Sequence, residues 1–419
     1  MVSETPPITG RVFPGSWLDH LLHDVPILDQ AGAPLNPYLP HAEHPRCLVA
    51  ALDHGNGAFK GVVRDANQPQ LHTRRVVSAY VPVPPSVSGS EEMPRTFRVD
   101  EGEAFRIGDE AIRQKGRAGD TLPIGQTAER LADARQTRFV LAFLVDMLIE
   151  AGYPEGYYPI LLGFGIPNDE FDREGGQMTV TRETRVVLSR LREEGTYRVV
   201  ADEGTRTTNW TLKIVSLAPL PQSIGSFFAW GRGINGRVLT GDMTGVRVLD
   251  IGGGHLQDLD IALNARGGHH AYGGILGDGT VVIAEQLRLM MRQSQRFPRA
   301  RFSVAELQQA LFTHQVQHGG SFVEIGDLVE DAIQSQGQTI IGLTLPALQD
   351  TRMFLLWTGG GAALLHEQIR ERSRVVGRSE QDYLVVPAPL APVLNAVGIY
   401  VHTLLTFRRG RANGSSERG

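Results

Sequence analysis

Apolar runs recur along the chain, and several of them end in glycine or in a polar residue. Short runs of aliphatic and β-branched residues predict strands, whereas apolar positions at helical spacing predict helices. Strands are predicted at 47–52, 61–64, 71–81, 97–107, 158–164, 178–191, 196–201, 210–217, 246–249, 258–262, 353–357 and 383–386. Helices are predicted at 127–151, 223–230, 281–291, 304–311, 322–333, 362–371 and 393–406. A glycine loop is predicted at 273–279.

Two of the predicted strands end in the same sequence pattern, an aspartate followed by glycines. The segment 247–261 reads RVLDIGGGHLQDLDI, in which Asp250 precedes Gly252, Gly253 and Gly254. The segment 47–60 reads CLVAALDHGNGAFK, in which Asp53 precedes Gly55, Asn56, Gly57 and Lys60. Glycines let backbone N–H groups approach an anion without a Cβ in the way, and a carboxylate beside a phosphate needs a metal ion or its water shell between the like charges. The repeated pattern predicts two loops that hold the phosphate chain of one nucleotide, although each alone is also typical of an ordinary turn.

Composition narrows the class of protein. The chain has 419 residues, 41% hydrophobic and 21% charged, which is ordinary for a globular protein of two or more domains. The formal net charge of −5 argues against a dedicated nucleic-acid or membrane surface. The single cysteine, Cys47, excludes an internal disulfide framework and indicates a reducing cytoplasm. The most apolar stretch, 139–149, is too short to span a bilayer and is interrupted by Asp146.

Three glycine motifs, each after a predicted strand, carry a family resemblance. DHGNGAFK at 53–60 looks like the first phosphate loop of the actin/Hsp70/sugar-kinase ATPase superfamily, LDIGGGHLQDL at 249–259 like its second, and LLWTGGGAALL at 355–365 like its adenosine motif. The resemblance covers about 46–407 and leans toward bacterial actins of the ParM type, used in plasmid segregation. The features that carry this leaning are Asn56, Lys60, FRIGDEA at 105–111, LLGFGIPNDEF at 161–171, PQSIGSF at 221–227 and LNAVGIY at 394–400.

The resemblance implies an α/β actin-like ATPase fold, with two related ribonuclease-H-like α/β domains and a nucleotide cleft between them. It places a first domain with an inserted subdomain at 46–236 and a second domain at 237–390. A helix at 391–407 would return to the first domain. Residues 1–45, rich in Pro and His, are expected to form a partly disordered extension, and 408–419 a disordered tail.

The resemblance also implies roles for individual residues. Asp53 and Asp250 would hold a hydrated Mg²⁺, Lys60 would add a charge beside the phosphates, and Gln222 would position the attacking water. The glycines of both loops, with Asn56 and His255, would surround the phosphates of ATP or GTP. The adenosine would lie flat against Gly359, Gly360 and Gly361, opposite a wall formed by the glycine loop that contains Gly274. Lys60 as a solvated strand end and Gln222 as an ordinary first residue of a helix are the structural alternatives.

Two departures from the family pattern bear on the second loop. His255 stands where the family usually has Thr or Ser, and the closing aspartate is displaced to Asp258, with Gln257 in its register position. A separate match, GRGING at 231–236, has the dinucleotide-binding spacing, but no apolar strand precedes it.

The leading functional hypothesis is a cytoplasmic, filament-forming ATPase that segregates DNA or organises a cytoskeleton. Its expected partners are further copies of itself and a DNA-binding adaptor protein, without direct nucleic-acid or membrane binding. A sugar-type kinase of the same superfamily and a nucleotide-binding scaffold that has lost hydrolysis are the alternatives. The altered second loop motivates the scaffold hypothesis.

Overall fold

The computed structural model describes residues 8–28, 32–55, 57–83, 94–113, 120–121, 127–174, 177–193, 195–239, 241, 243–263, 269–297 and 300–414. These residues fall into two units. As far as the ranges are described, the first unit comprises Phe13–His54, Ala58–Leu239 and Asn395–Gly419, and the second comprises Met1–Val12, Gly55–Gly57 and Thr240–Leu394. Among the described residues, no helix combines the length and apolar character needed to cross a membrane.

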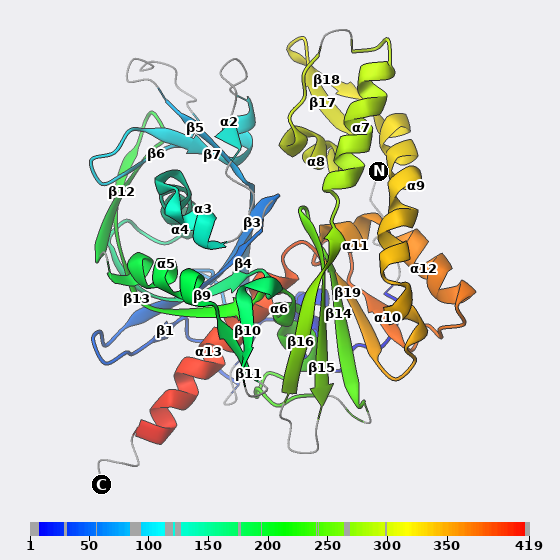
Figure 1. The fold of residues 1–419 in the computed structure, drawn as a ribbon. Coiled ribbons are helices and arrows are strands. Elements are labelled where there is room, and N and C mark those ends of the chain that lie inside the picture. The colour runs from blue at the N-terminus through cyan, green and yellow to red at the C-terminus, as the bar shows by residue number, and fades with distance from the viewer. Residues whose placement is uncertain are drawn as a thin grey trace. The chain divides into compact units, whose positions relative to one another are not determined.

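The first unit is a mixed α/β structure (Figure 1). Its strands are β1 (Tyr38–Leu39), β2 (Cys47–His54), β3 (Ala58–Arg64), β4 (Leu71–Val77), β5 (Ala79–Pro82), β6 (Thr96–Val99), β7 (Phe105–Ile107), β8 (Asp120–Thr121), β9 (Tyr157–Ile166), β10 (Phe171–Glu174), β11 (Gln177–Val180), β12 (Thr196–Asp202) and β13 (Thr207–Pro221). Its helices are α1 (Trp17–Leu22), α2 (Gly108–Arg113), α3 (Thr127–Ala132), α4 (Ala134–Glu150), the 3₁₀ turn η1 (Asn168–Glu170), α5 (Arg182–Glu193), α6 (Gln222–Gly231) and α13 (Leu394–Gly414).

One large sheet organises this unit. Its strand order is β4-β3-β2-β9-β13-β12-β6-β7-β5-β8, and β1 pairs with β2. The β2–β9 and β9–β13 pairs are parallel, and the other pairs are antiparallel. Every residue of β2 is buried, as expected for a central strand that is covered on both faces. In Figure 1 the sheet curls around α3 and α4.

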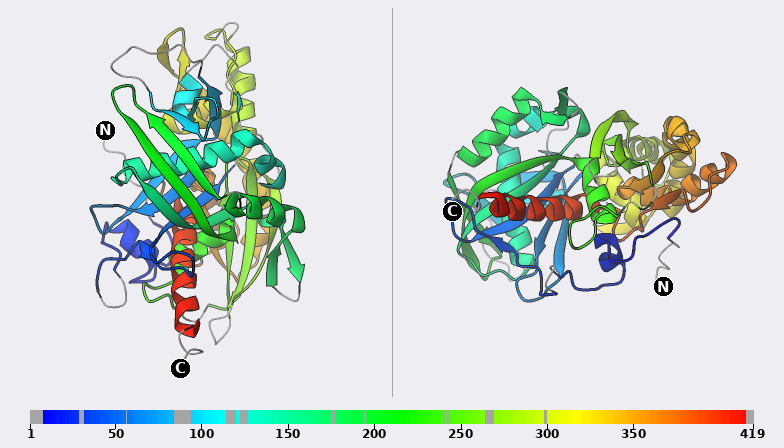
Figure 2. Two further views of the ribbon diagram at one scale, coloured as in Figure 1. Left: turned by 90° about the vertical axis from the view of Figure 1, so that its left-hand side faces the viewer. Right: turned by 90° about the horizontal axis from the view of Figure 1, so that it is seen from below.

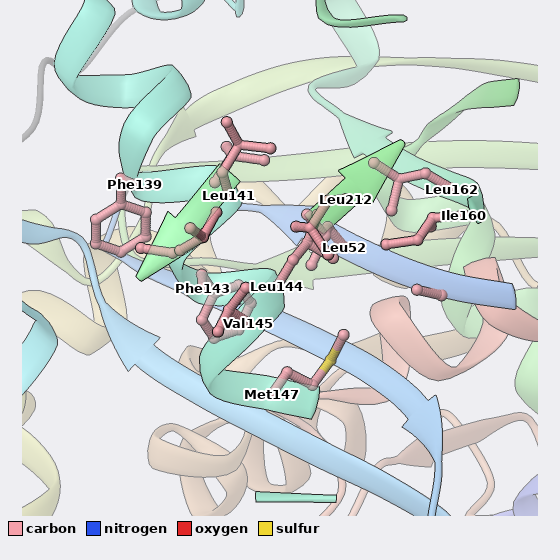
Figure 3. Packing of buried hydrophobic residues seen from close by; sticks show 14 of the residues in the cluster. Leu52, Phe139, Leu141, Phe143, Leu144, Val145, Met147, Ile160, Leu162 and Leu212 are labelled. Carbon is pink, nitrogen blue, oxygen red and sulfur yellow. The ribbon is translucent and has the colours of Figure 1, made fainter. Parts of the chain in front are cut away.

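Helix α4 supplies much of the core of the first unit. Its buried positions include Phe139, Phe143 and Met147, which recur every fourth residue along one face. Figure 3 shows these side chains beside Leu52 of β2, near residues from β9 and β13. Gly61 of β3 permits the close approach, because a Cβ there would lie 2.7 Å from Met147 Sδ. Each such side chain contributes about 1.5–3 kcal/mol when it is removed from water.

Helix α13 lies against this sheet (Figure 2). The contact is made at glycine positions. A Cβ at Gly163 of β9 would lie 2.2 Å from Thr403 Oγ1, and one at Gly165 would lie 2.5 Å from Ile399 Cδ1. Where α13 crosses α6, a Cβ at Gly398 would lie 1.6 Å from the Gly225 carbonyl oxygen. The glycines in three of the motifs that carried the resemblance therefore serve helix packing.

The second unit has its own sheet and core. Its strands are β14 (Gly245–Ile251), β15 (His255–Leu263), β16 (His269–Asp278), β17 (Gln315–His318), β18 (Ser321–Glu324), β19 (Phe354–Thr358) and β20 (Tyr383–Val385). Its helices are α7 (Val281–Gln293), α8 (Val304–Thr313), α9 (Gly326–Leu343), α10 (Leu345–Gln349), α11 (Gly360–Leu364) and α12 (His366–Val375). The sheet order is β16-β15-β14-β19-β20, in which β14, β19 and β20 are parallel. In Figure 1, α7, α8 and the hairpin β17–β18 lie together at the top of this unit.

Some predicted elements are wrong in type. The strand predicted at 178–191 is strand β11 followed by helix α5, because Thr184, Leu188 and Leu191 are buried at helical spacing. The β-branched residues of that segment resembled a strand although their burial follows a helix. The helix predicted at 322–333 begins as strand β18, and α9 starts only at Gly326.

Other predicted elements differ in their bounds. The helix predicted at 127–151 breaks at Asp133, whose side chain accepts a hydrogen bond from the Arg135 N–H and caps α4. The helix predicted at 362–371 is divided into α11 and α12 at Leu365. Helix α13 continues to Gly414, so the tail predicted at 408–419 is helical over most of its length, and 415–419 lie outside the described residues. The N-terminal segment contains helix α1, capped by Ser16.

The crossing of α6 and α13 leads to a stability prediction. In Gly398→Ala the new methyl group would overlap the Gly225 carbonyl, so we expect the free energy of unfolding of the first unit to fall by about 1–3 kcal/mol or more. The matched control is Gly342→Ala in α9, where a Cβ meets no heavy atom within 4 Å. That variant should be unchanged or more stable by up to about 1 kcal/mol. Urea denaturation followed by circular dichroism compares them, and equal midpoints for the two variants would contradict this packing.

Candidate functional site

The second predicted phosphate loop is a turn whose carbonyl groups accept hydrogen bonds from the segment at the start of α7. The backbone N–H groups of Gly279, Thr280 and Val281 donate to the carbonyl oxygens of Gly254, Gly252 and Gly253, at 3.0, 2.9 and 2.8 Å. The Gln308 side chain adds a hydrogen bond of 2.9 Å from Nε2 to the Gly253 carbonyl. The start of α7 thus fixes the orientation of all three peptide groups.

Unlike the carbonyl groups, most N–H groups of this turn are not hydrogen-bonded within the described residues. The Gly252 N–H donates to the His255 carbonyl at 2.9 Å. Within the part of the chain that the structure describes, the N–H groups of Gly253 and Gly254 make no hydrogen bond, and both residues are partly exposed. Consecutive N–H groups without an internal partner, next to the N-terminus of a helix, are the kind of backbone arrangement that binds anions in proteins.

Asp250 lies where two parallel strands end. It is the penultimate residue of β14 and is paired with Thr358, the last residue of β19. Its side chain is buried, and a Cβ at Gly359 would lie 2.3 Å from Asp250 Oδ1. Gly359 also has a φ of +85°. This position therefore requires glycine for two reasons, the lack of space for a Cβ and the left-handed backbone conformation. The predicted metal-binding aspartate and the predicted adenosine motif are therefore neighbours, at the carboxyl ends of strands where ligands of α/β sheets commonly bind.

The predicted glycine loop at 273–279 is wrong, because strand β16 continues to Asp278. Gly274 lies within this strand, and its N–H donates to Asp258 Oδ1 at 3.1 Å. The glycine that approaches the phosphate turn is Gly279, where a Cβ would lie 2.2 Å from the Gly252 carbonyl oxygen. The predicted loop ended at Gly279 but its role was assigned to Gly274, since a glycine-rich strand and a glycine loop have the same local pattern. His255 begins β15 opposite Asp278.

The displaced aspartate Asp258 is engaged within the sheet. Burial raises its pKa, followed by the nearby charge of Asp260, while the Gly274 N–H acts in the opposite direction. Gln257, which stands in the register position of the family aspartate, is buried beside a register shift in β15.

The first predicted phosphate loop begins at the end of β2. Asp53 and Lys60 are cross-strand partners on β2 and β3, and Lys60 Nζ lies 2.9 Å from Asp53 Oδ2. Asp53 is only 1% exposed, and its Oδ1 has no hydrogen-bond partner among the described residues. Asn56 lies outside the described residues, and Gly55 and Gly57 belong to the second unit.

A buried polar cluster beneath Asp53 was missed by the sequence analysis. Arg130 of α3 donates from Nη1 to the His54 carbonyl at 3.0 Å, and burial lowers the pKa of Arg130 to about 9. Gln136 Nε2 lies 2.6 Å from His54 Nε2. Burial, and then the Arg130 charge, lower the pKa of His54 well below 6.5, so the ring stays neutral. The only local signal was a histidine between the aspartate and glycine of the loop, and its partners come from helices more than seventy residues away.

Gln222 is the first residue of α6, directly after the end of β13, and it is buried. The following residue, Ser223, accepts a hydrogen bond of 3.0 Å from the Asn168 side chain of η1. Farther along the helix, Ser226 Oγ donates to Asn395 Oδ1 at 2.6 Å. Three of the motifs that carried the resemblance therefore meet at α6, while GRGING at 231–236 forms a turn after this helix rather than following a strand.

Comparison with known proteins agrees with this geometry at the level of fold. No family model and no curated protein matches the chain. A 15-stranded ParM filament from Clostridium botulinum matches with a TM-score of 0.61 at 14% identity, over 89% of this chain and 100% of that chain. Ta0583, an archaeal actin homolog, matches with a TM-score of 0.59 at 18% identity, over 85% and 99%. The actin-like protein Alp7A matches with a TM-score of 0.59 at 15% identity, over 88% and 99%.

The chain has the actin-like fold. The predicted α/β class and the resemblance to ParM-type actins are confirmed at this level. The residue roles implied by the resemblance stay predictions.

Each of the two predicted metal-binding aspartates, taken within its own unit, has a side chain that fits a magnesium ion held through water. Asp53 Oδ1 is a buried carboxylate oxygen without a hydrogen-bond partner in the described residues, which suits a metal-bound water as donor. In the second unit, Asp250 is likewise a buried carboxylate. The described residues contain no group of three or more His, Cys, Asp or Glu side chains that could hold a metal directly.

The neutral, buried His54 leads to a pH prediction. Because its pKa is lowered on folding, the unfolded chain binds a proton below pH 6.5 that the folded chain does not bind. The stability of the first unit should therefore fall as the pH decreases from 6.5, by up to about 1.4 kcal/mol per pH unit from this group.

We expect His54→Gln, which does not titrate, to lose less stability than wild type between pH 7.5 and pH 5.5 in urea denaturation. The control is His23→Gln, since the His23 side chain is 67% exposed. If the His54 variant and the control show the same pH slope, the buried His54 does not contribute to the acid sensitivity.

Proposed function

We propose that the chain is a filament-forming ATPase that binds ATP or GTP together with Mg²⁺. The observation that carries the proposal is the second phosphate turn. Its carbonyls are bonded to the start of α7, and the N–H groups of Gly253 and Gly254 remain for an anion. The actin-like fold, and an ADP complex of the archaeal actin homolog Ta0583, support a nucleotide as that anion.

The charges at the site favour a polyphosphate with a cation. An anion at Gly253 and Gly254 would lie near the buried Asp250, so a cation is needed to offset the like charges. Bound Mg²⁺ would supply this charge and neutralise the phosphates. Asp250 and Asp53 would hold the metal-bound waters, and the Gly359–Gly361 segment beside Asp250 would face the nucleoside.

Lys60 and Gln222 complete the proposed reaction. Lys60 forms an ion pair with Asp53 at the end of β2, and its ammonium group would act as a point charge for the phosphates. Gln222 would orient the attacking water through its side-chain amide. Catalysis of this kind is mainly positioning and charge stabilisation, so a neutral amide is sufficient.

Assembly follows from the nature of the solved structures that match. A ParM filament is among them, and we propose that this chain also self-associates into filaments. Segregation of plasmid DNA through a DNA-binding adaptor, in the cytoplasm and without direct contact to nucleic acid or membrane, is the role proposed for the polymer. The net charge of −5 fits an indirect link to DNA.

Replacing the two aspartates tests the nucleotide site. We expect Asp250→Asn and Asp53→Asn to lower phosphate release by about two orders of magnitude or more, because each removes a carboxylate that positions the metal-bound waters. Asp172→Asn, at an exposed position of β10, is the matched control. Phosphate release is measured with Mg-ATP and Mg-GTP for all three variants. Wild-type turnover in both Asp250 and Asp53 variants would show that other groups hold the metal.

Replacing Gln222 separates hydrolysis from assembly. We expect Gln222→Ala to bind ATP as wild type does, to release phosphate more slowly and to form polymer that persists longer, because loss of the γ-phosphate drives disassembly. Gln222→Glu is the conservative control and should retain more turnover than the alanine variant. Light scattering and phosphate release are followed together after ATP addition.

Four outcomes would change the proposal. If wild type does not scatter light over a range of protein concentrations, the filament is excluded. Turnover that needs an added hydroxyl compound would indicate a sugar-type kinase, and ATP binding without any turnover would indicate a scaffold. Polymer of Gln222→Ala that disassembles at the wild-type rate would show that Gln222 does not position the water.

A further inference from the structure

Helix α8 presents two side chains to the two glycine motifs of the second unit. Gln308 and Phe312 are four residues apart, so they lie on one face of the helix about 6 Å apart along its axis. Leu307, Ala310 and Leu311 on its other faces are buried in the core. The apolar spacing at 304–311 predicts this helix, but no sequence motif assigns a role to Gln308 or Phe312.

The position of α8 is well determined at both ends. Ser303 and Glu306 form a capping box at its start, with Glu306 Oε2 accepting from the Ser303 N–H at 2.8 Å. His314 ends the helix in the left-handed conformation, and its N–H donates to Ala310. The capped and buried helix therefore holds its outward face in a fixed direction.

Gln308 contacts the phosphate turn. Its Nε2 donates to the Gly253 carbonyl, which also accepts from the Val281 N–H. Holding this carbonyl from two sides keeps the adjacent Gly254 N–H pointed away from it, because the carbonyl and that N–H belong to the same planar peptide group. Gln308 thus supports the N–H group on which anion binding depends.

Phe312 contacts the other glycine motif. A Cβ at Gly360 would lie 3.2 Å from Phe312 Cζ, so the ring edge rests on the glycine backbone. Phe312 is 40% exposed, whereas Leu307, Ala310 and Leu311 of the same helix are buried in the core. An exposed aromatic ring beside a segment without side chains is suited to stack against a flat heterocycle.

We propose that Phe312 is the stacking wall for the nucleobase and that Gln308 is a positioning residue for the second phosphate turn. The inference rests on the proposed nucleotide binding and deepens it, because one helix face would contact the base and the phosphate turn. Stacking on a ring does not distinguish one purine from another, so Phe312 contributes equally to ATP and GTP binding.

The probes are Mg-ATP, Mg-GTP and inorganic tripolyphosphate with Mg²⁺, with dissociation constants measured by calorimetry. We expect Phe312→Ala to weaken ATP and GTP binding by about 5- to 100-fold and to leave tripolyphosphate binding unchanged. Phe312→Trp should restore nucleotide binding, and Phe312→Leu, which keeps an apolar side chain against Gly360, should remain weak. Phe322→Ala, at a 67% exposed aromatic residue of β18, is the control for loss of a surface ring.

Gln308 has the opposite pattern. Gln308→Ala and Gln308→Glu both lose the donor to the Gly253 carbonyl. Within each variant, the binding of tripolyphosphate, ATP and GTP should therefore be weakened by the same factor. Gln309→Ala, on the same helix, is the matched control and should bind all three probes as wild type does.

The outcomes separate this inference from the proposed function. If wild type binds neither nucleotide nor tripolyphosphate, the proposed function fails. If wild type binds ATP but no tighter than tripolyphosphate, or if Phe312→Leu binds ATP as wild type does, the stacking role is wrong while the nucleotide site stands. Equal weakening of all probes by Phe312→Ala would show a structural role and would also overturn it.

Discussion

The hydrogen bonds between the first residues of α7 and the carbonyls of the triple-glycine turn are the constraint on which the second unit depends. Three backbone donors and one side-chain donor fix three consecutive peptide groups. Glycine is needed at position 279, since a Cβ at Gly279 would lie 2.2 Å from the Gly252 carbonyl oxygen. Because the carbonyls are bonded on one side, the remaining N–H groups are directed to the other. Under the proposed function, the turn would be preorganised for an anion before any ligand arrives, which is what electrostatic binding requires.

In the first unit, the C-terminal end of β2 is organised by buried polar side chains rather than by backbone hydrogen bonds to a turn. Asp53, His54 and Arg130 are all at least 95% buried, and each is stabilised by a hydrogen bond or ion pair. A buried charge without a partner would cost several kcal/mol, so the set is expected to respond as a group when one member is changed. Titratable side chains on the adjacent strands β2 and β3 are accommodated in two ways. His54 stays uncharged, whereas Lys60 forms an ion pair with Asp53.

Glycine has three distinct uses in this chain, and local sequence does not separate them. Gly253 leaves room for backbone groups at a turn, Gly359 has a positive φ against Asp250, and Gly398 allows two helices to cross. Gly274 shows the difficulty, because the glycine-rich segment around it was predicted as a loop and is a strand. The same ambiguity affected 178–191, where β-branched residues suggested a strand and burial at helical spacing produced α5.

The sequence by itself determined the central strands β2, β9, β14 and β19, most of the helices α4, α7 and α13, and the glycine motifs that follow the strands, because continuous apolar runs and glycine turns are local properties. It also indicated the actin-like fold, through the order and spacing of those motifs. Tertiary structure decided the course of β16, the helical identity of α5, the contact of Gln308 and Phe312 with two separate glycine motifs, and the partners of His54. These features depend on side chains and peptide groups brought together from distant parts of the chain, and the energy of such contacts has no counterpart in any local pattern.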